Sequence, residues 1–302
     1  MKKNLFSVDI GGSKLICGAL TRTGEILESV RFDYAPGYTV EMLTDMIREG
    51  YLRLSAYEFD ACGAAIPGLC DPKAGTWIYS PFSGIGDVPV AQILHGITGL
   101  PVFVDNDVNV SALAERCFGA CPDSEDFLWI TVSNGIGGGL FLRGDLYRGA
   151  RMTAGEIGHV IVEEVNGRVC GCGNRGCLEA MASGASIAAI YAERTGKRID
   201  TKTLAALARD GDAESARVFS EAGAYIGKAA AHTVNLLGLD TVVIGGGVSE
   251  SFDLIEAGIR SAFGRFVFEK ANPSVAVLPS ALGRYAALKG GAALVLYAEE
   301  RA

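Results

Sequence analysis

The sequence lacks several features that would point to a secreted, membrane-bound or nucleic-acid-binding protein. No apolar run reaches the ~18 residues that a membrane-spanning helix needs, and the apolar run before Asp9 is too short for a signal peptide. Basic residues are outnumbered, since the 302 residues carry a net charge of −8, and a negative protein repels a phosphate backbone. We therefore expect a cytoplasmic protein with small-molecule partners, and neither a membrane nor a nucleic acid among them.

Glycine and cysteine are abundant instead. The 40 glycines are about twice the number expected at the average usage of ~7%, but they follow no G-X-Y period, so they serve individual turns. The eight cysteines occur in a chain much longer than the small secreted proteins that depend on disulfides. We expect these thiols to be reduced.

Short apolar strands alternate with amphipathic helices along the chain, which predicts an α/β protein. The first three strands predict an antiparallel meander, and Gly, Pro and acidic residues at 118–126 mark a domain boundary. A strand, a glycine turn and a second strand recur in each half, which hints at two related halves. Strands are expected at 5–10, 15–20, 26–32, 60–66, 101–104, 127–133, 139–144 and 241–244, and long helices at 39–54, with Thr39 as N-cap, and 212–237, with Gly238 as stop.

Three glycine-rich turns each follow an apolar strand, and such turns let backbone N–H groups approach a phosphate. No Walker A or G-x-G-x-x-G sequence is present. Each turn alone could be a structural hairpin, but three in one chain favour nucleotide binding. Asp9 could hold Mg²⁺ beside the phosphates, or it could serve the turn itself. The candidate cofactor-binding residues are Asp9, Gly11, Gly12, Ser13, Lys14, Asn134, Gly135, Gly137, Gly138, Gly245, Gly246 and Gly247.

The segment VDNDVN follows a buried strand and begins a helix. Open α/β sheets bind ligands at the carboxyl ends of their strands. A carboxylate there could take the proton from a substrate hydroxyl that attacks a phosphoryl group. The alternative is that Asp105 or Asp107 caps the helix.

His159, Cys170, Cys172 and Cys177 form the pattern H-x10-C-x-C-x4-C. Three thiolates and an imidazole suit tetrahedral Zn²⁺, and four protein ligands would make the site closed and structural. Reduced thiols without a metal are the alternative. Glu156 and Glu179 flank this loop as candidate acceptors for sugar hydroxyls, although ordinary surface glutamates would look the same.

The motifs DIGGSK, VDNDVN, GIGGG, GEIGH, CGCGNRGCLE and IGGGV, in this order, resemble the ROK family of sugar kinases and sugar-responsive repressors. The resemblance covers essentially the whole chain. It implies a two-domain α/β fold of the actin-like ATPase (ribonuclease H-like, hexokinase) type, with ATP and Mg²⁺ in a cleft between domains 1–117 and 118–283. The C-terminal segment 284–302 would pack on the first domain, and a homodimer or homotetramer is implied as well.

The resemblance also implies residue roles. Asp107 matches the catalytic base, His159 matches both a sugar ligand and a zinc ligand, and the three glycine turns match the phosphate and adenosine sites. The residues implied to bind the sugar are Gly68, Asn106, Asp107, Glu156, His159 and Glu179.

The sequence departs from the family pattern at Asn134, where Thr is usual, and at Phe82, where many sugar-kinase members have Asn. The expected activity is phosphorylation of a hexose by ATP, glucose to glucose 6-phosphate. N-acetylmannosamine, N-acetylglucosamine and fructose are the alternative substrates. A non-enzymatic repressor is less expected, because only eight residues precede Asp9.

Overall fold

The computed structural model describes residues 3–35, 37–80 and 83–301, and the chain divides into two compact units. The sequence predicts a domain boundary after residue 117. In the structure unit 1 continues to Pro122 and also contains residues 148–153. Among the described residues, no helix combines the length and apolar character needed to span a membrane. Unit 1 comprises Met1–Pro122, Arg148–Thr153 and Arg284–Ala302, and unit 2 comprises Asp123–Tyr147 and Ala154–Gly283.

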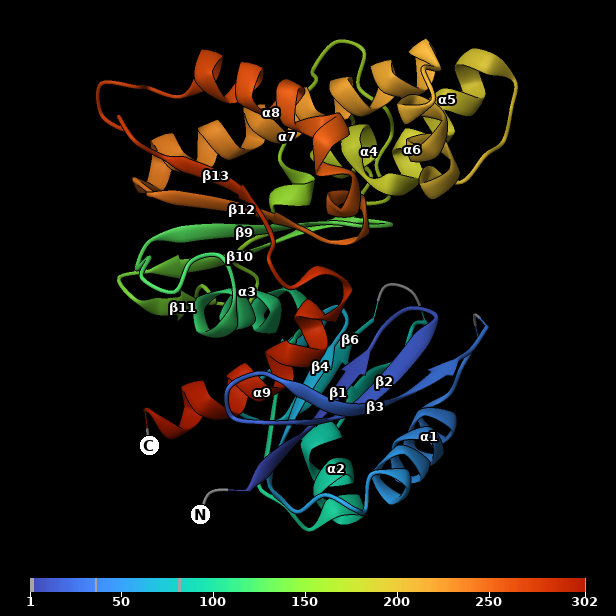
Figure 1. The fold of residues 1–302 in the computed structure, drawn as a ribbon, viewed down its shortest axis with the longest axis vertical. Coiled ribbons are helices and arrows are strands. Elements are labelled where there is room, and N and C mark those ends of the chain that lie inside the picture. The colour runs from blue at the N-terminus through green and yellow to red at the C-terminus, as the bar shows by residue number, and fades with distance from the viewer. Residues whose placement is uncertain (1–2, 36, 81–82, 302) are drawn as a thin grey trace. The chain divides into compact units, whose positions relative to one another are not determined.

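Unit 1 is built on a five-stranded sheet of order β3-β2-β1-β4-β8 (Figure 1). β1 pairs antiparallel with β2 and parallel with β4, so the predicted meander continues into parallel strands. A smaller sheet has the order β5-β6-β7. The elements are β1 (Asn4–Ile10), β2 (Lys14–Leu20), β3 (Ile26–Asp33), α1 (Val40–Arg53), β4 (Phe59–Ile66), β5 (Leu69–Asp71), β6 (Thr76–Tyr79), β7 (Gly86–Val88), α2 (Val90–Thr98), β8 (Val102–Asn106), α3 (Asp107–Phe118), η3 (Gly283–Tyr285) and α9 (Ala286–Glu299).

The two faces of this sheet bury different helices, because successive side chains of a strand point to opposite faces. Phe6 and Val8 of β1 pack in a core shared with α1 and α2, whereas Leu5 packs with residues of α9. Glycines bring α9 directly onto the sheet: a Cβ on Gly63 would lie 1.9 Å from the carbonyl oxygen of Gly291. The C-terminal helix therefore completes the core of unit 1.

Unit 2 repeats this plan with a sheet of order β11-β10-β9-β12-β13. β9 pairs antiparallel with β10 and parallel with β12, as β1 does with β2 and β4. The elements are β9 (Phe127–Val132), β10 (Ile136–Leu142), β11 (Asp145–Tyr147), η1 (Ile157–His159), α4 (Leu178–Ala182), α5 (Gly184–Thr195), α6 (Thr201–Arg209), α7 (Ala213–Leu237), β12 (Thr241–Gly245), η2 (Gly247–Ser251), α8 (Phe252–Phe266) and β13 (Ala276–Pro279).

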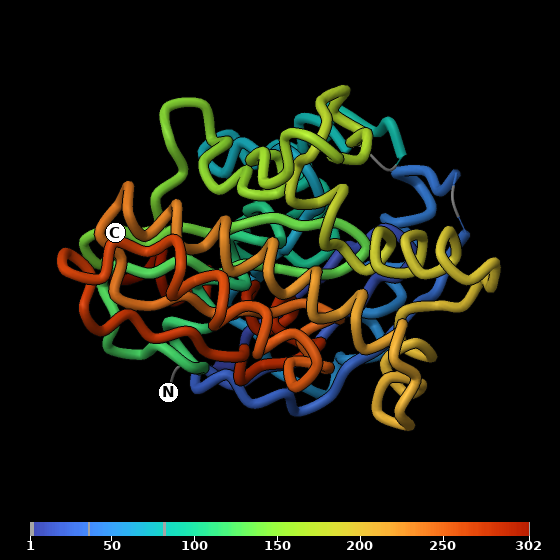
Figure 2. The backbone as a smooth tube through the Cα atoms, turned by 90° about the horizontal axis from the view of Figure 1, so that it is seen from above, coloured from blue at the N-terminus to red at the C-terminus, as the bar shows by residue number. Residues whose placement is uncertain are grey.

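Helices α7 and α8 run side by side over one face of this second sheet (Figures 1 and 2). Their backbones nearly touch, since a Cβ on Gly223 of α7 would lie 2.2 Å from the carbonyl oxygen of Ile255 in α8. Leu128 and Ile130 of β9 lie in the same core as these helices. Glycines on both helices therefore permit this close packing.

Two local sequence signals are confirmed. The hydroxyl of Thr39 accepts a hydrogen bond from the N–H of Met42 at 3.3 Å and caps α1. The long predicted helix ends at Gly238, which adopts the left-handed conformation at φ +69°. Each signal depends on residues close in sequence, so each could be recognised without knowing the tertiary structure.

Candidate active site

Two carboxylates lie near each other in unit 1, at the end of β1 and the start of α3. Asp9 is only 6% exposed and Asp107 is half-buried. Burial, together with the nearby charge of Asp9, raises the pKa of Asp107 to about 7. Burial also raises the pKa of Asp9 to about 6, an effect that the charge of Lys14 opposes. A carboxylate that titrates near neutral pH is suited to accept a proton as a general base.

Asn106 connects this acidic pair to the loop after β4. Its Oδ1 accepts N–H groups from the first turn of α3, including that of Val108 at 2.8 Å, and its Nδ2 donates to the carbonyl oxygen of Gly68 at 2.7 Å. The alternative that Asp105 or Asp107 caps this helix is wrong, because Asn106 is the N-cap. The Asn106 side chain also hydrogen-bonds the Asp107 carboxylate, and its contact with Gly68 brings two predicted sugar-binding residues together.

Asp105 has a different task, although it stands in the same motif. It is 1% exposed, and its Oδ2 lies 2.7 Å from both Nε and Nη2 of Arg148. Its Oδ1 accepts from the backbone N–H of Asn106 at 2.7 Å and from Nδ2 of Asn109 at 3.1 Å. These contacts fix the backbone immediately before Asp107. The sequence analysis missed Arg148, since nothing in the pattern links residues 43 positions apart.

The first predicted phosphate turn joins β1 to β2. The N–H of Gly11 donates to the carbonyl oxygen of Lys14 at 2.9 Å, and the hydroxyl of Tyr34 lies 2.6 Å from the carbonyl oxygen of Gly11. Gly12 and Ser13 at the tip are exposed. Hydrogen bonds to its carbonyl oxygens thus fix the turn, while the tip stays accessible to a ligand. Tyr34 was not recognised from the sequence, because it follows the end of β3 and is 20 residues from Lys14 in the chain.

The second predicted turn is shorter than the sequence suggested. Ser133, Asn134 and Gly135 form the connection between β9 and β10, whereas Gly137 and Gly138 lie inside β10. A Cβ on Gly138 would lie 2.8 Å from the carbonyl oxygen of Gly155. Gly138 therefore allows two backbones to pack closely, and any contact of Gly137 or Gly138 with a nucleotide stays a prediction.

Glu179 of α4 holds this second turn. Its Oε2 accepts a hydrogen bond from the N–H of Ile136 at 3.0 Å, and a Cβ on Gly135 would lie 2.6 Å from the same oxygen. The carboxylate thereby has a fixed position. The contact also occupies one backbone N–H beside the turn, which is then not available to a phosphate.

The third glycine run, at the end of β12, is constrained by packing. Gly246 has φ +85°, and a Cβ there would lie 2.5 Å from the carbonyl oxygen of Val132. A Cβ on Gly245 would lie 2.5 Å from the Trp129 ring. Gly247 begins the short helix η2. Gly245 and Gly246 are thus required by the fold of unit 2 itself.

His159, Cys170, Cys172 and Cys177 come together as the sequence predicted, with their ligand atoms within 4.8 Å of one another. The sulfurs of Cys172 and Cys177 are 3.7 Å apart, and the Cys170 sulfur lies 3.7 Å from Nδ1 of His159. Ligands held ~2.0–2.3 Å from a tetrahedral zinc ion are separated by roughly 3.5–3.8 Å. The cluster therefore fits zinc, and with four protein ligands it leaves no open coordination position.

The loop around this cluster supports the same interpretation. A hydrogen bond from the backbone N–H of Asn174 lowers the pKa of the Cys172 thiol, which favours the thiolate that binds metals. Gly176 has φ +75°, and a Cβ there would lie 1.7 Å from the carbonyl oxygen of Glu163. Only glycine fits at this bend, directly before Cys177.

His159 also faces a predicted sugar ligand. While Nδ1 points to the cysteine cluster, Nε2 lies 3.8 Å from Oε2 of Glu156. Both side chains are exposed. A metal on one ring nitrogen would orient the other nitrogen beside the Glu156 carboxylate. Phe82, which departs from the family pattern, lies outside the described residues.

Two sheets of the same order, each with a turn between its first two strands, define an α/β fold of the actin-like ATPase or hexokinase type. The chain is similar to a crystal structure of a ROK family glucokinase from Streptomyces griseus in complex with glucose and AMPPNP. The TM-score is 0.85 at 31% identity, covering 96% of this chain and 98% of the other.

The chain belongs to the ROK family, whose model matches residues 5–298. A glucokinase from Halalkalibacterium halodurans is 31% identical over 95% of this chain and 93% of its own length. A xylose repressor from Bacillus spizizenii is 29% identical over 87% of this chain and 68% of its own length. The relatives of this chain thus include both kinases and repressors.

Proposed function

We propose that the protein is an ATP-dependent kinase that phosphorylates a hexose hydroxyl. The observation that carries this proposal is the carboxylate pair of unit 1, in which Asp107 has a pKa of about 7 beside Asp9. A structural carboxylate is normally paired with a cation, as Asp105 is with Arg148. Similarity to glucokinases over more than nine-tenths of the chain supports the same activity.

In this proposal Asp107 accepts the proton of the attacking sugar hydroxyl. The new O–P bond forms between the sugar oxygen and the γ-phosphorus, and the bond to the ADP oxygen breaks. Asp9 supplies oxygen ligands for Mg²⁺, which neutralises negative charge on the phosphates when it is bound with ATP. Gly12 and Ser13 contribute backbone N–H groups and Lys14 a positive charge to phosphate binding, while Gly11, whose N–H is bonded to the carbonyl oxygen of Lys14, shapes the turn.

Residues of unit 2 serve binding in the same proposal. Glu156, His159 and Glu179 accept or donate hydrogen bonds to sugar hydroxyls, with Gly68 and Asn106 of unit 1. The turns at Asn134 and at Gly245 contact the nucleotide, and their backbone conformation is already fixed by packing. The His159 and cysteine cluster holds structural zinc, which keeps the His159 ring and the following α4 segment in position.

Glucose is the substrate we propose, on the oxygen that gives glucose 6-phosphate. A coupled assay of ADP release tests this across glucose, fructose, mannose, allose, N-acetylmannosamine and N-acetylglucosamine. We expect sugar-dependent ADP release above the background ATPase rate, highest with glucose. A higher kcat/KM with an N-acetyl sugar or fructose would reassign the substrate, and no stimulation by any sugar would contradict a hexose kinase.

A sugar-responsive regulator is the second candidate, because the xylose repressor matches 87% of this chain. The two functions separate in one experiment. Sugar binding measured by calorimetry without ADP release, together with sequence-specific DNA binding at moderate salt, would favour the regulator. The net charge of −8 supports the kinase.

We further propose a homodimer or homotetramer that works in the cytoplasm. All eight cysteines are free thiols in the structure, and a reducing compartment keeps zinc-binding thiolates from forming disulfides. Light scattering of the purified protein measures the oligomeric state directly.

A further inference from the structure

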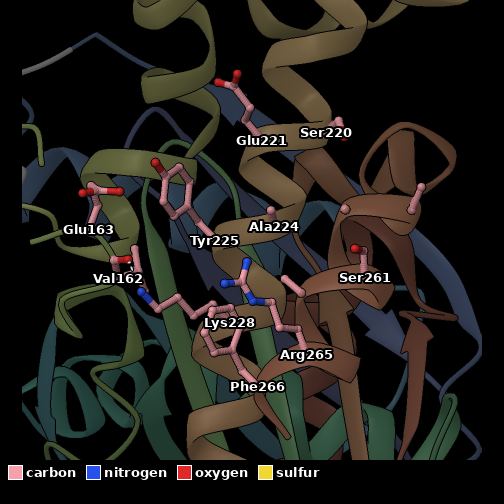
Figure 3. Close-up of a pocket in the computed structure, with 13 residues that line it drawn as sticks. Val162, Glu163, Ser220, Glu221, Ala224, Tyr225, Lys228, Ser261, Arg265 and Phe266 are labelled. Atoms are coloured by element: carbon pink, nitrogen blue, oxygen red, sulfur yellow. Dashed lines mark hydrogen bonds between the residues drawn. The ribbon is translucent and has the colours of Figure 1, made fainter. Parts of the chain in front are cut away.

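A pocket in unit 2 contains none of the residues assigned to the candidate active site. It lies between α7 and α8 and is closed on one side by Val162 and Glu163 (Figure 3). Ala224 of α7 and Gly258 of α8 line its floor, where the two helices touch: a Cβ on Gly258 would lie 2.2 Å from the carbonyl oxygen of Ser220. Its volume of about 480 Å³ is within the range of small-molecule sites.

Two cationic side chains and one aromatic ring form the lower part of this pocket. The guanidinium carbon of Arg265 lies 5.3 Å from the centre of the Phe266 ring, and Nζ of Lys228 lies 5.4 Å from it. Figure 3 shows Arg265 reaching from α8 toward α7, with its guanidinium between Tyr225 and Phe266. Both positive charges are thus presented beside one ring.

The two cations retain most of their hydrogen-bonding capacity. Lys228 donates to the carbonyl oxygen of Val162 at 2.7 Å, and an ammonium group has two further donors. Within residues 3–35, 37–80 and 83–301, Arg265 has neither an ion pair nor a hydrogen bond, and its guanidinium lies over the Phe266 ring. A guanidinium offers five donors in a planar fork.

The acidic residues of the pocket are already engaged elsewhere. Glu221 pairs with Arg194 at 2.7 Å and with Arg217 at 2.9 Å. Oε1 of Glu163 accepts two backbone N–H groups of its own loop, one of them from Val165 at 3.0 Å. The backbone N–H groups of Asn166 and Val165, and to a lesser extent the charge of Lys228, lower the pKa of Glu163. Arg265 is therefore the cation whose charge these carboxylates leave unbalanced.

We propose that this pocket is a second binding site, for a small molecule that carries a phosphate group. The fork of Arg265 takes two phosphate oxygens, and Lys228 supplies charge to a third. The hydroxyl of Ser261, which also lines the pocket, is a further donor. Three terminal oxygens match this set of donors better than the two coplanar oxygens of a carboxylate, and the Phe266 ring gives the organic part of the ligand an apolar surface.

Calorimetric titration with inorganic phosphate tests the site without using catalysis, so its outcome is independent of the proposed kinase activity. Glucose is added first at saturation, and the comparison with the Arg265→Ala variant distinguishes this pocket from other phosphate sites. We expect saturable binding to the wild-type protein and weakening by about 10-fold or more in Arg265→Ala, because charge-assisted hydrogen bonds are lost. Acetate at equal ionic strength should bind at least several-fold more weakly.

Arg260→Ala is the matched control, since Arg260 lies on the same helix and pairs with Glu256 at 2.8 Å. It removes the same charge from α8, and phosphate binding should be unchanged. Arg265 is exposed, so its substitution leaves the core intact, and an unchanged melting temperature verifies this. The proposal is overturned if wild-type protein shows no saturable phosphate binding, if Arg265→Ala binds as the wild type does, or if both variants weaken binding equally.

Discussion

Units 1 and 2 have sheets of the same strand order, but the turns between their first two strands differ in chemistry. Asp9 is the penultimate residue of β1, and Thr131 is the penultimate residue of β9. In unit 1 a buried carboxylate therefore stands before a turn that is followed by Lys14. In unit 2 the corresponding turn is followed by Ile136, whose N–H is bound by Glu179. Only the first turn combines an acid, a cation and an accessible tip.

The comparison teaches that one fold plan supports two kinds of site. Unit 1 concentrates groups that can hold a metal–phosphate complex and accept a proton. Unit 2 fixes Glu179 with a backbone hydrogen bond and holds His159 beside a cysteine-rich loop, an arrangement that favours rigidity. Substitutions of catalytic candidates should therefore change turnover more than stability, and substitutions of structural residues should do the reverse.

Asp107→Asn should have the largest effect. It removes the proton acceptor while keeping the shape of the side chain, so kcat in the ADP-release assay should fall by about 10²–10⁴-fold. Calorimetry should find sugar affinity within a few-fold of the wild type. Near-normal turnover in this variant would remove Asp107 from the catalytic role.

Loss of the proposed zinc ion should destabilise unit 2. We expect about one equivalent of zinc per chain by elemental analysis, and Cys172→Ser should reduce zinc affinity by roughly 100-fold or more, since it removes a ligand directly. Melting temperature and activity should fall together on chelation. Cys117→Ser, at an exposed cysteine outside the cluster, is the control and should retain the zinc. A metal-free protein with normal stability would refute a structural zinc site.

Asp105→Asn distinguishes the structural role of Asp105 from the catalytic role proposed for Asp107 in the same motif. It breaks a buried ion pair and leaves Arg148 without its carboxylate partner, which costs about 3 kcal/mol of unfolding free energy. Chemical denaturation measures this loss. Asp107→Asn should not show it, because no Lys or Arg in the described part of the chain forms a hydrogen bond or an ion pair with Asp107. Equal destabilisation by both substitutions would contradict the division of roles.

Stability should depend on pH through Asp107. Its folded-state pKa, about 7, lies above the ordinary value of 3.8, so the folded state favours the protonated carboxyl. Its ionisation therefore lowers stability as the pH rises from about 4 to about 7. Asp107→Asn should be equal to the wild type at pH 4 and more stable by about 2 kcal/mol at pH 8. Melting curves at both pH values measure the difference, and a constant offset would show that Asp107 does not titrate in this range.

Tyr34→Phe should have the smallest effect. It removes the hydroxyl that contacts the carbonyl oxygens of Gly11 and Lys14, at a cost of about 1 kcal/mol. If the turn binds phosphate, KM for ATP should rise a few-fold while KM for the sugar is unchanged. Tyr57→Phe, on a tyrosine outside this turn, provides the comparison. A change in sugar KM alone would place Tyr34 elsewhere in the mechanism.

Much of the fold was predictable because its signals are local. The strand alternation, the Thr39 cap and the Gly238 stop each involve neighbouring residues. The spacing of His159 and the three cysteines likewise predicted the cluster that these candidate metal ligands form. By contrast, the pairing of Asp105 with Arg148 joins residues far apart in the chain. Such contacts depend on how the elements pack, which residue spacing does not reveal.

The same reason explains the errors within the candidate site. Asp, Asn and Ser are all good helix caps, so the motif around Asp105 could not identify Asn106 as the N-cap. Nor did the run of glycines at 135–139 reveal where the turn ends and β10 begins, since glycine suits both a turn and a close backbone contact such as that of Gly138 with Gly155.

Phosphorus NMR of a mixture of protein, ATP, Mg²⁺ and glucose tests the proposed kinase activity most directly, because it identifies the phosphorylated product itself. The wild-type protein should convert the γ-phosphate of ATP into a glucose 6-phosphate resonance, and Asp107→Asn should leave the ATP signals unchanged over the same time. Release of inorganic phosphate alone, or an equal yield of sugar phosphate from the variant, would contradict the assignment of Asp107 as the base of a hexose kinase.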